Sequence, residues 1–142
     1  MKIAIACDHG GYVLKTAVIE HLKEKGYEVT DFGCDSTASV DYPSYARNVA
    51  ETVANGKADK GIVICTTGIG VSIVANKVKG VRCALCSEQT SARLTRMHND
   101  ANVLAMGGGI VGPNLGIDIV DTFLNTEFCG EEKHARRIAA IE

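Results

Sequence analysis

The chain has 142 residues, a formal net charge of −2 at pH 7 and no strongly basic segment. This length suits one domain, and the weak negative charge argues against nucleic acid or an anionic membrane as a partner. No segment approaches the roughly 18 uncharged apolar residues of a membrane span, and Met1 leads directly into a predicted strand. We therefore expect a cytoplasmic protein whose six cysteines are reduced thiols.

Strands and helices are predicted to alternate along the whole chain. Short apolar runs bounded by glycine and polar turn residues predict five strands, and apolar residues at helical spacing predict the helices between them. The expected strands are 2–7, 27–33, 61–65, 80–85 and 102–106. The expected helices are 12–25, 44–55, 69–78, 88–97, 116–125 and 131–141, with a polar loop at 34–43.

Two of these helices carry specific expectations about their faces and ends. The first should end at Gly26, and it should bury one apolar face, made of Val13, Leu14, Ala17, Val18, Ile19 and Leu22. The helix at 88–97 should be capped by Ser87, because a serine hydroxyl can accept a hydrogen bond from a free amide of the first turn.

Strands that alternate with helices predict an α/β fold with parallel strands covered on both sides. We expect a three-layer αβα sandwich with a Rossmann-like five-stranded parallel sheet, formed by residues 1–142 as one domain. In such sheets, ligands bind beyond the carboxyl ends of the strands. The segments expected at that edge are 8–9, 65–70 and 107–109.

The stretch GIVICTTGIGVS, residues 61–72, joins a buried strand to a small-residue loop and a helix start. The backbone N–H groups of such a loop point outward and bind anions. They should also stabilise a thiolate at Cys65, where the strand ends. Cys65 is therefore a candidate nucleophile or general base. The alternative is a buried core cysteine followed by an ordinary strand-to-helix turn.

Two further groups carry acid and base side chains. Asp8 and His9 follow the first strand, next to glycines that let a ligand approach the backbone. Asp8 could simply cap the helix that follows, but a cap does not require His9. His98 lies between a helix end and a strand, where a histidine can serve only as a partner of the helix dipole.

Two common interpretations of these motifs do not fit the sequence around them. The TTGIG loop lacks the GxGxxG pattern of dinucleotide-binding turns, and no P-loop lysine follows it. Cys83 and Cys86 form a CxxC pair, but they lie in a predicted strand and no second pair completes a zinc set. We therefore expect neither a cofactor nor a metal.

Six motifs, taken in order, resemble one known family. They are ACDHGG, DYPSYA, CTTGIGVSIVANK, VRCALC, HNDANVLAMGG and HARRI. At this spacing they resemble type B ribose-5-phosphate isomerase and the related isomerases of galactose 6-phosphate and allose 6-phosphate. The resemblance covers essentially the whole chain, and DHGG, CTTGIG and HNDAN are its most specific parts.

The resemblance implies an aldose–ketose isomerisation through an enediolate, a reaction of the pentose phosphate pathway. It implies that Cys65 moves the proton from carbon two to carbon one and that His98 opens the furanose ring. Some members carry the base as a glutamate further along, where this chain has Ser72, so it resembles the cysteine branch. Thr67 would move the hydroxyl proton, and Asp8 would orient the substrate hydroxyls. The implied substrate-binding residues are His9, Tyr42, Thr66, Gly68, Ile69, Gly70, Asn99, Lys133, Arg136 and Arg137.

The resemblance also implies that two chains share each sugar-phosphate site, in a homodimer that could pair into a tetramer. This chain departs from the family where the phosphate is bound. Most relatives have an arginine at the position of Gly109, and Lys133 replaces another beside a one-residue insertion. The insertion leaves open whether Arg136 or Arg137 contacts the phosphate. We expect a weaker preference for phosphorylated over free sugars.

Three alternatives stay open from the residues. The chain could isomerise a six-carbon sugar phosphate, such as allose or galactose 6-phosphate, or free aldoses. It could be a phosphate-ligand sensor domain, which would explain the anion-binding loop but neither the thiol nor His98. It could be a cysteine hydrolase or phosphatase, although CTTGIGVS lacks the arginine that a phosphatase loop requires.

Overall fold

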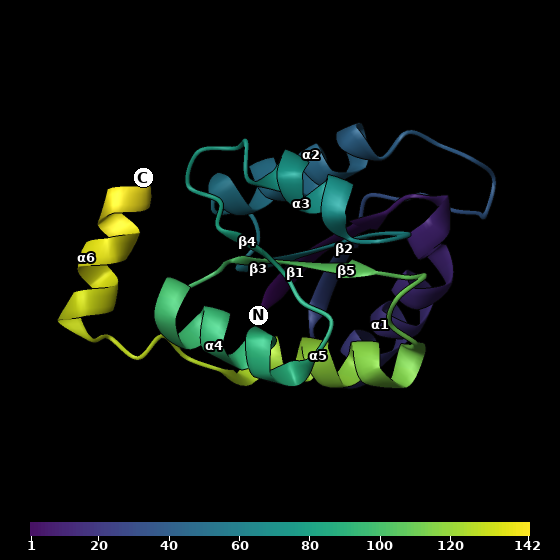
Figure 1. Cartoon of the computed structure of the whole chain (residues 1–142). Coiled ribbons are helices and arrows are strands. Elements are labelled where there is room, and N and C mark those ends of the chain that lie inside the picture. The colour runs from purple at the N-terminus through teal and green to yellow at the C-terminus, as the bar shows by residue number, and fades with distance from the viewer.

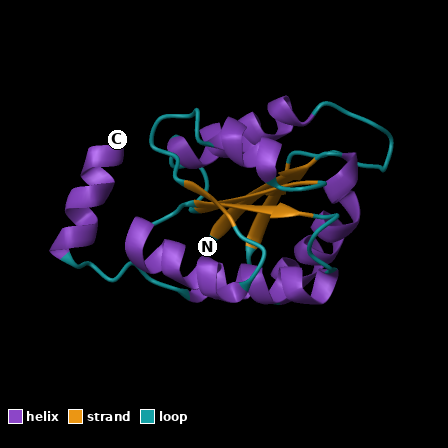
Figure 2. Ribbon diagram, in the orientation of Figure 1, coloured by secondary structure: helices purple, strands orange, loops and turns teal.

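The computed structural model describes residues 1–142, and its centre is one five-stranded parallel sheet (Figures 1 and 2). The strands are arranged in the order β2-β1-β3-β5-β4, and every neighbouring pair is parallel. Their bounds are β1 Lys2–Cys7, β2 Glu28–Asp31, β3 Lys60–Cys65, β4 Cys83–Leu85 and β5 Val103–Gly107. The chain moves outward from β1 to β2 on one side and to β3 on the other, so the topological switch point lies between β1 and β3.

Helices cover both faces of the sheet, as Figure 1 shows. On one face lie α2 (Tyr42–Ala54) and α3 (Ile69–Ala75). On the other lie α1 (Tyr12–Glu24), α4 (Gln89–Asn99) and α5 (Pro113–Asn125), whereas α6 (Glu132–Ile141) projects beyond the end of α4. This arrangement confirms the predicted three-layer α/β sandwich. Measured by length and hydropathy together, none of these helices qualifies as a membrane span.

The alternation of side chains along each strand divides the core into two layers. Ile3 and Ile5 point to the layer that contains α1 and α5, whereas Ala4 and Ala6 point to the layer that contains α2. Large side chains fill the first layer. The alanines of the second layer let the α2 backbone lie close to the sheet, which places the start of α2 next to the end of β3.

The buried face of α1 differs from its prediction at two positions. Val13 is 66% exposed, whereas Lys15 is only 2% exposed. Lys15 is buried because its Nζ donates to Asp31 Oδ1 and to the carbonyl oxygen of Cys34, each at 2.7 Å. A charge is stable in a core only with such partners. The same contacts tie α1 to the end of β2, and Gly26 follows α1 with a positive φ of 82°, as expected.

Three element ends were predicted wrongly, and in each the cause is a polar side chain. Glu88, not Ser87, caps α4, because its carboxylate accepts from the amides of Thr90 at 2.5 Å and Ser91 at 2.7 Å. The helix predicted at 69–78 and the strand at 80–85 are both shorter. The Asn76 side chain bonds to both the N–H and the carbonyl of Cys83, where a neighbouring strand would otherwise bond.

The other boundaries shift by a few residues. The polar loop predicted at 34–43 ends earlier, because Tyr42 and Pro43 already belong to the first turn of α2. Proline suits that turn, which has no intrahelical acceptor for its N–H. The second strand is limited to Glu28–Asp31, and α5 begins at Pro113.

Candidate active site

A cleft of about 520 Å³ opens at the carboxyl ends of β1 and β3, at the switch point of the sheet. The two strands are paired in register, with Cys7 opposite Ile64, so Asp8 and Cys65 emerge side by side. The cleft is lined by Asp8, His9, Tyr42, Cys65, Thr66, Thr67, Ile69, Gly70 and Ile73. All of these except Ile73 are residues that the sequence motifs had singled out.

Cys65 lies at the base of this cleft with its side chain 5% exposed. Its Sγ accepts a hydrogen bond from the Gly68 amide at 3.1 Å. Gly68 has a φ of 78°, and a Cβ there would lie 2.5 Å from Leu85 Cδ1, so this turn requires glycine. Cys65 is thus a buried residue, as the structural alternative proposed, but its sulfur also has a dedicated donor and faces a cleft.

The loop amides after Cys65 divide into used and free donors. The Gly68 N–H goes to Cys65, and the Ile69 N–H donates to Thr67 Oγ1 at 3.2 Å. The amide of Gly70 donates to no acceptor within the chain. Gly70 also packs against the Tyr42 ring, whose Cζ lies 2.6 Å from where a Cβ would stand, so Tyr42 forms the wall of the cleft here.

Asp8 both caps a helix and lines the cleft. Its Oδ1 accepts from the amides of Gly10 at 2.9 Å and Gly11 at 3.3 Å, in the short 3₁₀ turn His9–Gly11 that precedes α1. His9 is oriented from the backbone, because the Val40 amide lies 3.2 Å from its Nδ1 and donates to it. That contact makes Nδ1 an acceptor, so Nε2 carries the proton and is the donor available to a ligand.

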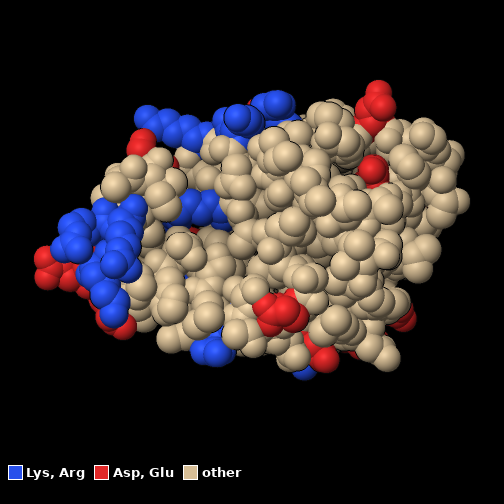
Figure 3. Space-filling model, viewed as in Figure 1, with Lys and Arg blue, Asp and Glu red and all other residues tan.

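His98 and Asn99 lie at the other end of the molecule. They occupy the last turn of α4, which runs from the carboxyl end of β4 back toward the start of β5. The basic residues of α6 lie at the same end of the molecule, as Figure 3 shows in the blue side chains over this helix. The structure therefore does not bring His98, Asn99, Lys133, Arg136 or Arg137 to the cleft of their own chain.

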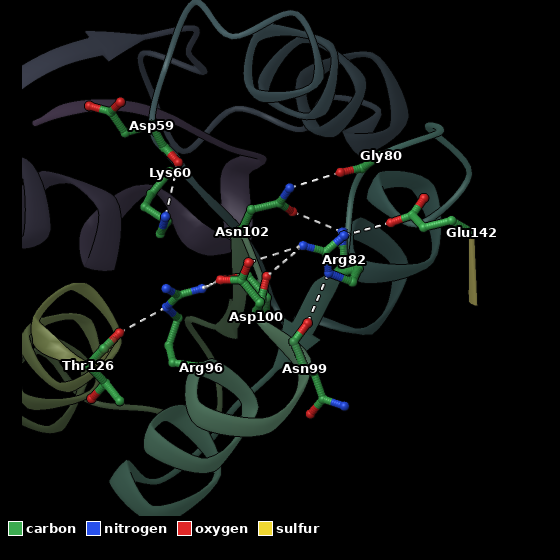
Figure 4. A network of polar contacts seen from close by, with 11 residues as sticks. Asp59, Lys60, Gly80, Arg82, Arg96, Asn99, Asp100, Asn102, Thr126 and Glu142 are labelled. Carbon is green, nitrogen blue, oxygen red and sulfur yellow. Dashed lines mark hydrogen bonds and ion pairs between the residues drawn. The ribbon is translucent and has the colours of Figure 1, made fainter. Parts of the chain in front are cut away.

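A polar network fixes this second group, shown in Figure 4. Arg96 Nη1 contacts Asp100 Oδ1 at 2.6 Å, and Asp100 takes a φ of 44° to end α4. Arg82 donates through Nε to the Asn99 carbonyl at 2.9 Å and pairs with Glu142 at 2.6 Å. Arg82 thus connects the end of α4, through Asn99, with the end of α6, through Glu142.

Next to this network, the rings of His98 and His134 are stacked, with centroids 4.3 Å apart. Burial and the nearby His98 lower the pKa of His134. Lys133 pairs with Glu131 at 2.8 Å on the exposed side of α6.

No role was predicted from the sequence for His134 or Ile73. The apolar spacing of Ile73 four residues after Ile69 was the one available signal for it.

Neither cysteine of the CxxC pair lines the cleft, although Cys86 lines a neighbouring pocket with Thr67 and Ile69. Burial raises the pKa of Cys83 to about 12 and that of Cys86 to about 11. Reactive cysteines need the opposite shift, because the thiolate is the nucleophile and the metal ligand. The physical setting of this pair does not favour redox or metal chemistry.

The sequence and the structure of this chain are similar to those of several known proteins. Residues 3–141 match the family model described as Ribose/Galactose Isomerase. The chain is 50% identical over 140 residues to ribose-5-phosphate isomerase B of Escherichia coli, covering 99% of this chain and 93% of that one. Its structure resembles that of the Clostridium thermocellum ribose-5-phosphate isomerase B, with a TM-score of 0.97, 54% identity and coverage of 99% and 95%. It also resembles the Mycoplasma genitalium enzyme with bound ribulose-5-phosphate, with a TM-score of 0.93, 46% identity and coverage of 99% and 93%.

Proposed function

This chain belongs to the ribose/galactose isomerase family, and we propose from that membership that it interconverts ribose 5-phosphate and ribulose 5-phosphate. The reaction removes a proton from carbon two of the aldose, forms an enediolate and returns the proton to carbon one. It needs a base of suitable strength, donors for the developing oxyanion and a cleft that excludes water. The observation that carries the proposal is the Cys65 thiol, which faces the cleft and accepts from the Gly68 amide.

Cys65 is the base in this scheme. The Gly68 N–H donates to the sulfur at 3.1 Å and holds it at the base of the cleft. The free amide of Gly70, at the start of α3, is a suitable donor for the enediolate oxygen. Thr67 is an exposed residue of the same loop and lines the cleft. Its hydroxyl moves the proton between the two substrate oxygens.

The residues of the β1 loop bind the rest of the substrate. Asp8 is held by two amides, so its second carboxylate oxygen is free to accept from a sugar hydroxyl. His9 presents Nε2–H toward the ligand because the Val40 amide occupies Nδ1. Tyr42, Thr66 and Ile69 close the walls around the carbon chain.

The cleft of one chain is incomplete for this reaction, because it contains no Lys or Arg for the phosphate and does not contain His98. The basic side chains and His98 lie together at the opposite end of the chain, around α6. α6 buries only His134, and its Ile141 is 64% exposed, while Ile69 and Ile73 beside the cleft are 52% and 56% exposed. We propose a homodimer in which His98, Asn99 and α6 of one chain complete the cleft of the other.

Mixing two inactive variants tests this shared site directly. Cys65→Ala and His98→Asn chains, unfolded together and refolded at equal concentration, should regain about one quarter of the wild-type activity. Half of randomly paired dimers are hybrids, and one of the two sites in each hybrid is intact. Turnover of each variant alone and of the refolded mixture is measured with ribose 5-phosphate. A mixture no more active than its components would show that both residues serve the same chain.

Gly109 affects how tightly the phosphate is held. The arginine that most relatives are expected to have there would project from the loop after β5, beside Thr66 and the cleft. Gly109→Arg should lower KM for ribose 5-phosphate by about tenfold, from a charge-assisted hydrogen bond, and leave KM for free ribose unchanged. The wild-type chain should correspondingly turn over free ribose at a measurable rate.

Gly109→Met is the matched control for that variant. A Cβ at Gly109 would lie 3.0 Å from both Cγ2 and the carbonyl oxygen of Thr66, so either side chain requires the same small shift of Thr66. Only arginine adds a charge. If methionine and arginine change KM equally, the departure at Gly109 affects loop shape and another cation binds the phosphate.

A further inference from the structure

A second group of reactive side chains lies outside the cleft, where the chain passes from α5 into α6. The Sγ of Cys129, a carboxylate oxygen of Glu131 and a ring nitrogen of His134 all lie within 4.8 Å of one another. Gly130 between the first two has a φ of 71°, a turn that lets Cys129 and Glu131 face the same side. No role in the isomerisation is assigned to these three atoms.

The group is held in place by its surroundings. The Cys129 amide donates to the Met97 carbonyl at 3.1 Å, which attaches this segment to the last turn of α4. The amides of His134 and Ala135 both donate to the Glu131 carbonyl at 3.0 Å, which fixes the first turn of α6. The positions of the three donors are therefore set by backbone contacts and not by each other.

His134 has a ring nitrogen that is free to bind a ligand. The residue is only 8% exposed, and one face of its ring is covered by the stacked ring of His98. Its ring nitrogens form no hydrogen bond within the chain, and they stay open to solvent, because no buried side-chain nitrogen or oxygen of this chain lacks a partner. The free ring nitrogen belongs to the same donor set as the thiol of Cys129.

We propose that Cys129, Glu131 and His134 form a site for a divalent transition-metal ion of the zinc class, next to His98. Thiolate, imidazole and carboxylate are the three ligand types that zinc takes, at about 2.0 to 2.3 Å, so neighbouring donors in a tetrahedral site are about 3.3 to 3.8 Å apart. Small side-chain rotations, chiefly of the exposed Glu131, that move the donor atoms by about 1 Å close the present spacing.

Binding proceeds by a simple exchange. The S–H bond of Cys129 breaks, the proton passes to solvent and the sulfur binds the ion, so the affinity rises with pH. Lys133, which pairs with Glu131, moves away as the ion binds. That ion pair is more than half exposed on both sides, and such pairs contribute little stability.

This placement gives the ion an effect on catalysis, a part of the inference that rests on the proposed function. An ion bound to His134 puts a positive charge next to the stacked His98 ring. Because the two rings are stacked, His98 also loses the freedom to move toward the sugar ring when His134 is fixed by the ion. Zinc should therefore inhibit the enzyme reversibly, although turnover itself needs no metal.

Cobalt(II) provides a readout that does not depend on activity. Titration of the reduced full-length protein with Co²⁺ should produce a thiolate-to-cobalt absorption band in the near ultraviolet, saturating at about one equivalent per chain. Cys129→Ser should abolish the band, and Glu131→Gln should weaken the affinity at least about tenfold. Cys83→Ser, at a half-buried cysteine with no imidazole beside it, should retain the band. No band in the wild-type protein, or a band that persists in Cys129→Ser, overturns the site.

Inhibition is tested separately with Zn²⁺ and ribose 5-phosphate. Cys129→Ser should have wild-type turnover without zinc and should need at least about tenfold more zinc for half inhibition, and EDTA should restore the wild-type activity. Equal zinc sensitivity of both proteins overturns the link to His98. A protein that binds cobalt through Cys129 but shows no isomerase activity would retain the metal site and reject the proposed function.

Discussion

Cys65→Ala and Cys65→Ser are each expected to lower kcat for ribose 5-phosphate by about 10³-fold or more while leaving the fold and substrate binding nearly intact. A serine hydroxyl loses its proton far less readily than a cysteine thiol, so it is a much poorer general base at neutral pH. Both replacements fit the same buried space at the end of β3, where Cys65 is 5% exposed. The measurement is steady-state turnover, with thermal unfolding and substrate-analogue binding to verify the fold and the site.

Cys86→Ser is the matched control for these variants. Cys86 is another buried cysteine just beyond the end of a strand at the same edge of the sheet, but no amide donates to its sulfur. It should retain most of the wild-type turnover. Near-normal activity in Cys65→Ser would contradict the assignment of the base, as would an equal loss in Cys86→Ser.

His98→Asn should reduce turnover of ribose 5-phosphate by about 10²-fold or more, the usual contribution of a general acid. The loss should be much smaller for a four-carbon aldose 4-phosphate. In that sugar O4 carries the phosphate, so no five-membered ring closes and no ring oxygen needs a proton. The ratio of kcat/KM values for the two substrates, in wild type and variant, measures the effect.

His21→Asn serves as the control histidine. Its Nε2 pairs with Asp121 at 2.8 Å between α1 and α5, outside the cleft and outside the His98 group. This variant should change kcat/KM only slightly, and by the same factor for both substrates. Equal losses on the two substrates in His98→Asn would mean that His98 positions the sugar and does not open the ring.

The local chemistry of the cleft could be predicted from the sequence because it depends on neighbours along the chain. A strand, a small-residue loop and a helix start are consecutive, so the Cys65 sulfur and the Gly68 amide meet within four residues. The Asp8 cap is local in the same way. The alternation of strands and helices predicts that both turns lie at the carboxyl edge of the sheet, but the strand order that places β1 beside β3 comes from the tertiary structure.

The tertiary structure alone decided which polar side chains are buried and where the site is divided. Lys15 is buried because Asp31 and the Cys34 carbonyl, both distant in sequence, meet its ammonium. The Cys129–Glu131–His134 group forms only because α6 turns back onto the end of α4. His98 is the tenth residue of α4, so nine steps of 1.5 Å carry it about 14 Å from the start of that helix, which lies at the edge that holds Cys65. Sequence motifs specify which groups a site contains, but helix length and direction determine whether one chain can bring them together.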